Sequence, residues 1–321
     1  MTASKPQNPP KKHHYVPKFL LKQWTDVQGK LVVYRRLKTG KVVHDRVAAK
    51  GVGYEDDLYT FEELGPDATI VETKLMSPLD DKAGKILTSL IESGGHELTE
   101  PEMIWWSHFL LSLIIRTPES VKGLKEAALD MWSAPSAKIQ ADYDNLKGEN
   151  DPPTFEEWVA SDTGEGAHLL GVKLLNTLTM NKKVAAHIRS MSWSVVTLDK
   201  GLPSLLTSDR AIFSSNGIKK YGGQLILPIG PRHLFCAFND KGYEAEVQSM
   251  PPEQIVDVAR KLITVRAQHF VYANNTKETD FVTEWLGYEK VATLGEQLTK
   301  GWKAEQASIT MPAPAPDEKP N

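Results

Sequence analysis

The sequence predicts an α+β fold with a mixed or antiparallel sheet. Segments of strand type occur near the start of the chain and again after residue 191, and helical segments fill the part between them. This order of strands, helices and strands is typical of α+β proteins. The chain has 321 residues, of which 40% are hydrophobic and 25% charged, so it can bury a substantial core.

The first strands form a predicted hairpin. Residues 31–36 and 41–44 alternate like strands, and the turn between them, 38–40, contains Gly40. A further short strand is predicted at 58–61. The later strands are predicted at 192–198, 205–207, 224–229 and 233–238.

Helices are predicted from apolar residues at helical spacing. The first, 69–93, is interrupted at Pro78, and the second begins with the capping box Thr99-Glu-Pro-Glu102. The remaining helices are predicted at 118–132, 136–147, 167–191, 252–272 and 278–304, with a second capping box at 154–157.

We expect one α+β domain over residues 13–304, with the helical segment 69–191 inserted between strands of a single sheet. The competing arrangement is two domains divided near residue 191. The polar, Pro-rich residues 1–12 and the Pro-rich residues 305–321 are expected to be flexible.

The charge of the chain is unevenly distributed. Residues 1–50 contain twelve Lys or Arg and two Asp, whereas the whole chain has a net charge of −3. Such asymmetry can indicate nucleic acid or another anionic partner, and the alternative is a solvated basic edge that complements the acidic remainder. The basic residues concerned are Lys11, Lys12, Lys18, Lys22, Arg35 and Arg36.

The sequence favours a cytoplasmic protein with no membrane segment. Its single cysteine, Cys236, excludes an intrachain disulfide and lies in an apolar run typical of a buried thiol. The start of the chain has no apolar signal core, and the longest apolar stretch, 103–115, is too short to span a membrane.

The segment His13-His-Tyr-Val-Pro-Lys-Phe-Leu-Leu-Lys-Gln-Trp24 resembles the opening signature of a bacterial family, domain of unknown function 4238. Further matches follow in order along the chain: Thr39-Gly40, Ile115-Arg-Thr-Pro118, Leu206-Thr-Ser-Asp209, Leu227-Pro-Ile-Gly-Pro231 and Asn274. The sequence departs from the family in one place. The family continues Ser-Asp with Asn-Pro, whereas this chain has Arg210-Ala211 after Ser208-Asp209. The resemblance implies an organisation of the chain and no particular activity.

His14 is the first candidate for catalysis. Pro17 restricts the backbone beside it, so the imidazole is held in a defined place, where it could serve as a general base. The alternative is a histidine that hydrogen-bonds the edge of a sheet. His13 is a weaker candidate of the same kind.

Three other residues are candidates. Arg116 ends an apolar helix and could bind a phosphate or carboxylate ligand, or pair with a carboxylate of the protein. Asp209 follows a strand and could orient His14, bind a metal or act as a base, and Ser208 could contribute to ligand binding. The alternative for both is a turn role, because Asp and Ser side chains bond to nearby backbone.

Several kinds of site have no signature here. The sequence contains no zinc-binding His or Cys spacing, no EF-hand loop, no phosphate-binding P-loop and no nucleophile elbow. Glu72, Asp80 and Asp81 are expected on a solvated helix face. Metal, cofactor and oligomeric state are therefore left unknown.

The sequence leaves three functions open. The favoured hypothesis is an enzyme that acts on nucleic acid or another phosphorylated substrate, with His14 and Asp209 in proton chemistry or metal binding and Arg116 holding anionic charge. The second is a non-catalytic binding or regulatory protein that uses the basic N-terminal surface, and the third is a structural partner protein. The first predicts that these three side chains converge on one cleft.

Overall fold

The computed structural model describes residues 11–94, 97–133, 137–148, 151–161, 165–215 and 217–292, together with Glu296 and Lys300. The expected flexible tail, 305–321, and residues 1–10 lie outside these ranges. The chain divides into two compact units: residues 1–118 with 175–291, and residues 119–174 with 292–321. The helical stretch 69–191 is thereby shared between the two units.

The first unit contains all the strands of the described chain. They are β1 (Lys12–His14), β2 (Lys30–Arg36), β3 (Val42–Ala48), β4 (Tyr54–Asp56), β5 (Ser192–Thr197), β6 (Thr207–Ser208), β7 (Phe213–Ser214), β8 (Gln224–Gly230), β9 (His233–Phe238) and β10 (Phe270–Ala273). They form three antiparallel sheets, in the orders β1-β4, β3-β2-β10-β6 and β5-β9-β8-β7. The predicted α+β class is therefore confirmed, with three sheets in place of one.

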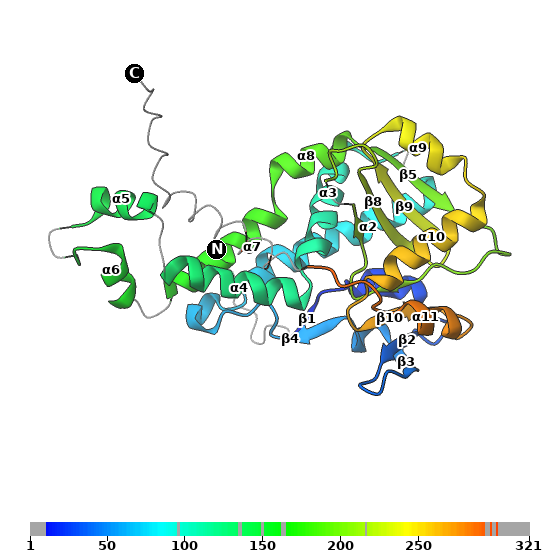
Figure 1. Ribbon diagram of the computed structural model, residues 1–321, viewed down its shortest axis with the longest axis horizontal. Helices are drawn as coiled ribbons and strands as arrows, with labels where there is room; N and C mark the ends of the chain where they lie inside the picture. The colour runs from blue at the N-terminus through cyan, green and yellow to red at the C-terminus, as the bar shows by residue number, and fades with distance from the viewer. Residues whose placement is uncertain are drawn as a thin grey trace, which may run out of the picture. The chain divides into compact units, whose positions relative to one another are not determined.

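The helices of the first unit surround these sheets (Figure 1). They are α1 (Lys18–Leu21), α2 (Ser77–Ser93), α3 (Glu100–Ile115), α8 (Lys182–Ser190), α9 (Lys241–Gln248), α10 (Pro252–Val265) and α11 (Thr279–Trp285). Short helices of other types are η1 (Lys22–Trp24), η2 (Ala49–Gly51) and η3 (Glu62–Asp67), all 3-10, and η4 (Glu72–Met76), a π-helix.

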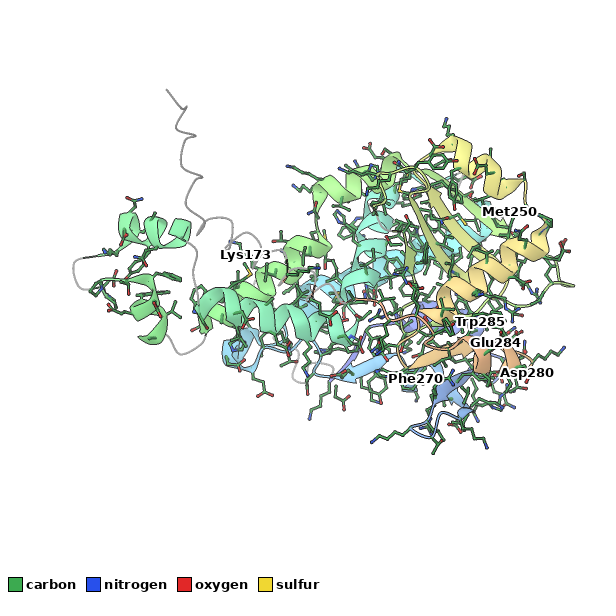
Figure 2. All side chains as sticks on the ribbon, viewed as in Figure 1. Lys173, Met250, Phe270, Asp280, Glu284 and Trp285 are labelled. Atoms are coloured by element: carbon green, nitrogen blue, oxygen red, sulfur yellow. The ribbon has the colours of Figure 1, made fainter. Side chains whose placement is uncertain are left out.

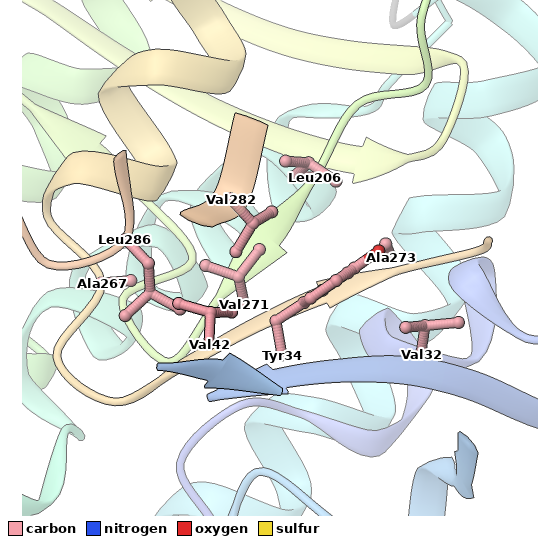
Figure 3. Close-up of a cluster of buried hydrophobic side chains, with 9 residues drawn as sticks. All are labelled: Val32, Tyr34, Val42, Leu206, Ala267, Val271, Ala273, Val282 and Leu286. Carbon is pink, nitrogen blue, oxygen red and sulfur yellow. The ribbon is translucent and has the colours of Figure 1, made fainter. Parts of the chain in front are cut away.

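The sheet β3-β2-β10-β6 joins the N-terminal hairpin to strands from the other end of the unit. Gly40, with φ 85°, provides the predicted turn between β2 and β3. Helix α11 covers one face of this sheet and carries Trp285, which is labelled in Figure 2. Lys261 of α10 ties the two helices together, because its Nζ lies 3.5 Å from the ring centre of Trp285. The buried side chains on this face are Val32, Tyr34, Val42, Leu206, Ala267, Val271, Ala273, Val282 and Leu286 (Figure 3).

The sheet β5-β9-β8-β7 is covered on both faces, and strand β9 shows why. Alternate residues of a strand point to opposite faces. Cys236 and Leu234 pack in the cluster that includes Val256 from α10, whereas the Phe235 ring lies 5.7 Å from that of Trp106 on α3. Both faces of β9 are therefore apolar, as the sequence requires for a strand between two helical layers.

Two helix starts follow from local sequence. The capping box of Thr99 and Glu102 begins α3 as predicted. Pro78 lies in the first turn of α2, where a missing N–H costs little. The interruption predicted at this proline is instead a change of helix type, because η4 runs directly into α2.

Four predicted elements differ from the structure. The helix predicted over 252–272 ends at Val265, and its last predicted residues belong to strand β10 (Phe270–Ala273). The strand predicted at 58–61 is absent among the described residues, and β4 precedes that segment. The helix predicted over 167–191 is divided at Asn181, whose side chain caps α8. The final predicted helix, 278–304, is interrupted after Trp285, where Gly287 adopts φ 68°, and most of residues 293–304 lie outside the described residues.

The second unit is helical in its described part. It contains most of α4 (Pro118–Ser133), α5 (Ala137–Leu146) and α6 (Phe155–Ser161), and the first part of α7 (Glu165–Thr179). An aromatic cluster holds it together, since the rings of Trp132 and Phe155 are 5.5 Å apart and those of Phe155 and Trp158 are 5.6 Å apart. In the part of the chain that is described, no helix has the length and apolarity to traverse a bilayer.

Candidate functional site

The His13–Pro17 motif forms strand β1 and the turn that follows it. His13 pairs with Glu55 and His14 with Tyr54 in the two-stranded sheet. The Gly53 carbonyl then accepts hydrogen bonds from the backbone N–H groups of Tyr15 and Val16, at 2.9 and 3.0 Å. These bonds fix the chain just after His13 and His14. Because they are consecutive residues of a strand, their side chains point to opposite faces.

His13 belongs to the core. Its ring is completely buried, stacks on Tyr59 at 5.4 Å and accepts a hydrogen bond at Nδ1 from the Tyr59 backbone N–H, at 3.0 Å. The Tyr59 hydroxyl in turn donates to the carbonyl of Arg116, at 3.2 Å. These contacts tie the chain start to the end of α3.

His14 lies in a cleft of about 530 Å³. Burial, together with the positive charges of Lys18 and Lys12, lowers the pKa of His14 to about 4, so the imidazole is neutral at pH 7. A hydrogen bond to the Lys12 backbone acts in the opposite direction. Nε2 is covered, and no described residue forms a hydrogen bond with it. An uncommitted lone pair of this kind is what a proton acceptor needs.

Three carboxylates share this cleft with His14, and two of them, Glu72 and Asp80, are buried or partly buried. The π-helix places Glu72, which is 8% exposed, beside Ser77, whose hydroxyl donates to Glu72 Oε1 at 2.8 Å. Asp80 lies one turn further along α2. Burial raises the pKa of Asp80 to about 6, and the nearby Glu72 adds to the rise. A π-helix changes the angular position of the residues around it, and such segments often occur at functional sites.

Arg116 supports Asp80 from inside the protein. Its side chain is completely buried, its Nη1 donates to Asp80 Oδ1 at 2.9 Å, and its Nη2 donates to Ser112. The guanidinium favours the ionised form of Asp80 and so opposes the effect of burial on its pKa. Of the two roles expected from the sequence, the structure shows the pairing with a carboxylate of the protein.

One face of α2 lines the cleft, because its residues recur every three or four positions. Gly84 is part of this face, and a Cβ there would meet the Phe19 ring at 3.4 Å. The exposed ammonium groups of Lys18, Lys22 and Lys85 surround the cleft. The complete lining is His14, Lys18, Phe19, Lys22, Glu72, Ser77, Asp80, Asp81, Gly84, Lys85 and Thr88.

The structure places Asp209 and Ser208 elsewhere. Asp209 is buried at the end of β6 and accepts three backbone N–H bonds, from Gln268 at 2.8 Å, His269 at 2.5 Å and Phe270 at 2.9 Å. Ser208 Oγ accepts from the backbone N–H of Arg210 at 3.1 Å. Neither residue lines the His14 cleft. Arg116 does not line the cleft either and reaches it through its bond to Asp80, so the three side chains do not converge on one cleft as predicted.

Five of the six basic residues near the start of the chain have separate surroundings, and the sixth, Lys11, is exposed. Lys18 and Lys22 line the His14 cleft, whereas Arg35 lines a different pocket and lies 3.9 Å from Asp45. Arg36 donates to the carbonyls of Gly40, Thr283 and Leu286. Lys12 lies 4.2 Å from the ring centre of Tyr54.

Glu72 and Asp80 are the residues that sequence reasoning missed. Their places on a predicted amphipathic helix suggested a solvated face, and only Pro78, two residues before Asp80, signalled an irregular backbone. The predicted burial of Cys236 is confirmed, and burial raises the pKa of its thiol to about 12. Among the described residues, no group of three or more His, Cys, Asp or Glu is placed to hold a metal ion.

Comparison with known proteins gives one match. Residues 12–277 match the family described as "Protein of unknown function (DUF4238)". No curated protein and no solved structure matches the chain. The matched region contains the His-Tyr-Val-Pro motif, the Ile115-Arg-Thr-Pro118 segment and the Leu206-Thr-Ser-Asp209 segment, on which the resemblance was based. The chain belongs to the DUF4238 family.

Proposed function

We propose that the His14 cleft is the acid–base site of an enzyme that acts on a phosphorylated substrate, with nucleic acid as the leading candidate. The observation that carries this proposal is the neutral imidazole of His14, with an uncommitted Nε2, in a cleft shared with two buried or half-buried carboxylates and three lysines. Proton transfer and charge stabilisation are the two contributions that phosphoryl transfer needs from side chains.

The lysines give the cleft its preference for an anion. Lys18, Lys22 and Lys85 are exposed, whereas Glu72 is buried and Asp80 is held by Arg116. A phosphate group that enters from solvent therefore meets three ammonium groups and one exposed carboxylate, that of Asp81, before it meets Glu72 and Asp80. Lysine binds phosphate as a point charge, so the cleft would accept phosphate esters of several shapes.

Binding of the anion would also prepare His14. Lys18 and Lys12 both lower its pKa, and a bound phosphate would offset their charge. Burial, the largest cause of the low pKa of His14, would remain, so this pKa would rise from about 4 towards 6.5 without exceeding it. Substrate binding thereby increases the fraction of His14 that is protonated and can serve as the acid.

The proton transfers then balance. A hydroxyl or water attacks phosphorus and gives its proton to the Asp80 carboxylate, whose pKa of about 6 suits a base near neutral pH. As the new P–O bond forms, the bond to the leaving oxygen breaks, and that oxygen takes the proton of His14. Because Nε2 is covered in the structure, the imidazole must turn towards the substrate for this step.

Arg116, Ser208 and Asp209 take other parts in this proposal. Arg116 is a positioning residue that holds Oδ1 of Asp80, which leaves Oδ2 to accept the proton. Ser208 and Asp209 support the fold at β6 and the start of β10. We further propose that the protein is bacterial and lies in the cytoplasm. Its single cysteine, Cys236, is a buried free thiol, which is compatible with a reducing compartment.

The test measures hydrolysis of bis(p-nitrophenyl) phosphate and of a short single-stranded RNA by the full chain. His14→Gln and Asp80→Asn should each lower kcat/KM by about 100-fold or more while the protein stays folded. Asp280→Asn, on the exposed surface of α11, is the matched control and should leave activity unchanged. The proposal fails if the wild type hydrolyses neither substrate, or if both folded variants retain wild-type rates.

A further inference from the structure

Glu72 and Ser77 form a pair of polar side chains in the wall of the His14 cleft. The π-helix η4 brings them together, because its hydrogen bonds join residues five apart. The backbone N–H of Ser77 donates to the carbonyl of Glu72, and the Ser77 hydroxyl donates to Glu72 Oε1 at 2.8 Å. In an α-helix the same two residues would lie about 140° apart around the axis. The irregular backbone is therefore what forms this pair.

The Glu72 carboxylate has no cation beside it. It is 8% exposed, and among the described residues no ion pair includes it, since the guanidinium of Arg116 bonds to Asp80 and Ser112. A buried charge is costly unless hydrogen-bond donors surround it. Ser77 supplies one donor, to Oε1, and Oε2 is left for a donor that comes from the cleft.

The pair offers the cleft acceptors only. The hydroxyl proton of Ser77 is committed to Glu72, so the Ser77 oxygen and Glu72 Oε2 can accept and cannot donate. The oxygens of a phosphodiester carry no proton and so cannot bond to them. An ammonium group could donate, but the lysines that surround the cleft repel it. A neutral hydroxyl group satisfies the pair and meets no such repulsion.

The cleft therefore combines acceptors for a hydroxyl group with positive charges for a phosphate. Glu72 lies close enough to Asp80, the proposed base, for its charge to raise the pKa of Asp80. A hydroxyl bound to Glu72 would accordingly lie near the reacting phosphate. In nucleic acid the hydroxyl beside a phosphate is the ribose 2′-hydroxyl, by which proteins distinguish RNA from DNA. Carboxylates bind ribose hydroxyls in this way in dinucleotide-binding folds.

We infer that Glu72 determines the specificity of this cleft: its Oε2 accepts a hydrogen bond from the ribose 2′-hydroxyl beside the reacting phosphate, and the substrate is RNA rather than DNA. This inference rests on the proposed function, because it takes the cleft to be a site for phosphate esters. Glu72 transfers no proton, which separates its part from that of Asp80.

The test measures binding of three nucleotides that differ only at the 2′ position: uridine 3′-phosphate, its 2′-fluoro analogue and 2′-deoxyuridine 3′-phosphate. Fluorine is close to a hydroxyl group in size but cannot donate a hydrogen bond. Binding is measured by calorimetry at low salt with the full chain carrying His14→Gln, because during a reaction the 2′-hydroxyl could also favour RNA as a nucleophile. Uridine 3′-phosphate should bind at least about tenfold more tightly than either analogue, since each analogue lacks a hydrogen bond to a charged acceptor.

Glu72→Gln, added to this protein, keeps an acceptor for Ser77 and replaces the free oxygen by an amide NH2, which cannot accept. It should reduce the preference for the hydroxyl to about twofold or less. Asp81→Asn is the matched control, because it removes an exposed carboxylate from the same cleft. It should change the affinity for all three nucleotides by one factor and preserve the preference.

The inference is overturned if uridine 3′-phosphate does not bind, if the three nucleotides bind equally, or if folded Glu72→Gln keeps the full preference. Equal loss of the preference in Asp81→Asn would also overturn it. Should Glu72→Gln fail to fold, the fluoro analogue decides, since binding as tight as that of the hydroxyl form refutes the hydrogen bond.

The same measurements separate this inference from the proposed function. A protein that prefers the hydroxyl form through Glu72, but hydrolyses neither bis(p-nitrophenyl) phosphate nor RNA, has the specificity and lacks the reaction. A protein that hydrolyses these substrates, but binds the three nucleotides equally, has the reaction and lacks the specificity.

Discussion

Arg116 and Asp80 form an ion pair in which the arginine is completely buried and the carboxylate is 23% exposed, with 2.9 Å between Nη1 and Oδ1. The pair joins the end of α3 to the first turn of α2 and fixes the carboxylate in the lining of the His14 cleft. The guanidinium has a further bond to Ser112. This arrangement makes Arg116 a determinant of both stability and the ionisation of Asp80.

Loss of the guanidinium should destabilise the fold. Arg116→Met leaves Asp80 without its cation, and breaking a buried ion pair from one side costs about 3–5 kcal/mol. Urea unfolding gives the free energy of the variant and of the wild type. A loss of less than about 1 kcal/mol would show that water replaces the guanidinium at Asp80.

The acid side of the pH profile of the proposed activity should follow Asp80, and the alkaline side should follow His14, which must be protonated to act as the acid. The pKa of Asp80 is about 6, so hydrolysis should decline as the pH falls through 6 and the base becomes protonated. Arg116 lowers this pKa, so Arg116→Met should move the decline to higher pH by about one unit, whereas Arg116→Lys, which keeps the charge, should move it less. An identical pH profile in the folded variants would contradict the assignment of Asp80 as the base.

Anion binding should raise the pKa of His14. Phosphate near Lys18 offsets one of the charges that depress this pKa to about 4, and NMR titration of the imidazole with and without phosphate measures the change. Lys18→Gln should raise the pKa of the free protein and reduce the effect of phosphate, with the exposed Lys82→Gln as the matched control. An unchanged His14 pKa at saturating phosphate would exclude the proposed coupling.

The same depressed pKa links His14 to stability. A group whose pKa is lower in the folded state than its usual 6.5 contributes stability above that pH and loses it as the pH falls through about 4. The free energy of unfolding should therefore decrease between pH 6.5 and 4 by about 1–2 kcal/mol more in the wild type than in His14→Gln, allowing for solvent screening of a half-buried ring. Parallel pH curves for the two proteins would show that His14 is not shifted.

Gly53 accepts hydrogen bonds from the turn after β1, and Gly29 is a matched control for substituting it. Both have positive φ, 67° and 72°, but a Cβ on Gly53 would lie 2.9 Å from Leu21 Cδ1, whereas Gly29 has nothing within 4 Å. Gly29→Ala should cost about 1 kcal/mol for the backbone alone, and Gly53→Ala should cost about 2 kcal/mol or more. Equal losses in urea unfolding would show that Leu21 yields to the added methyl group.

Local features of this protein could be predicted from its sequence. The hairpin around Gly40, the capping box of Thr99, the buried Cys236 and the succession of strands, helices and strands were all recognisable. Each depends on a short stretch of chain, in which side-chain period and backbone preference act without long-range contacts. The family could be recognised for the same reason, from motifs at fixed places along the chain.

Tertiary structure decided which polar residues meet. Asp209 and Asp80 are both carboxylates near apolar segments, but one accepts three backbone N–H bonds while the other lies beside Arg116 and His14. Nothing local distinguishes them, because burial and ion pairing depend on which distant segments pack together. The same packing buries His13 against Tyr59 and leaves His14 in the cleft, although the two histidines are adjacent in sequence.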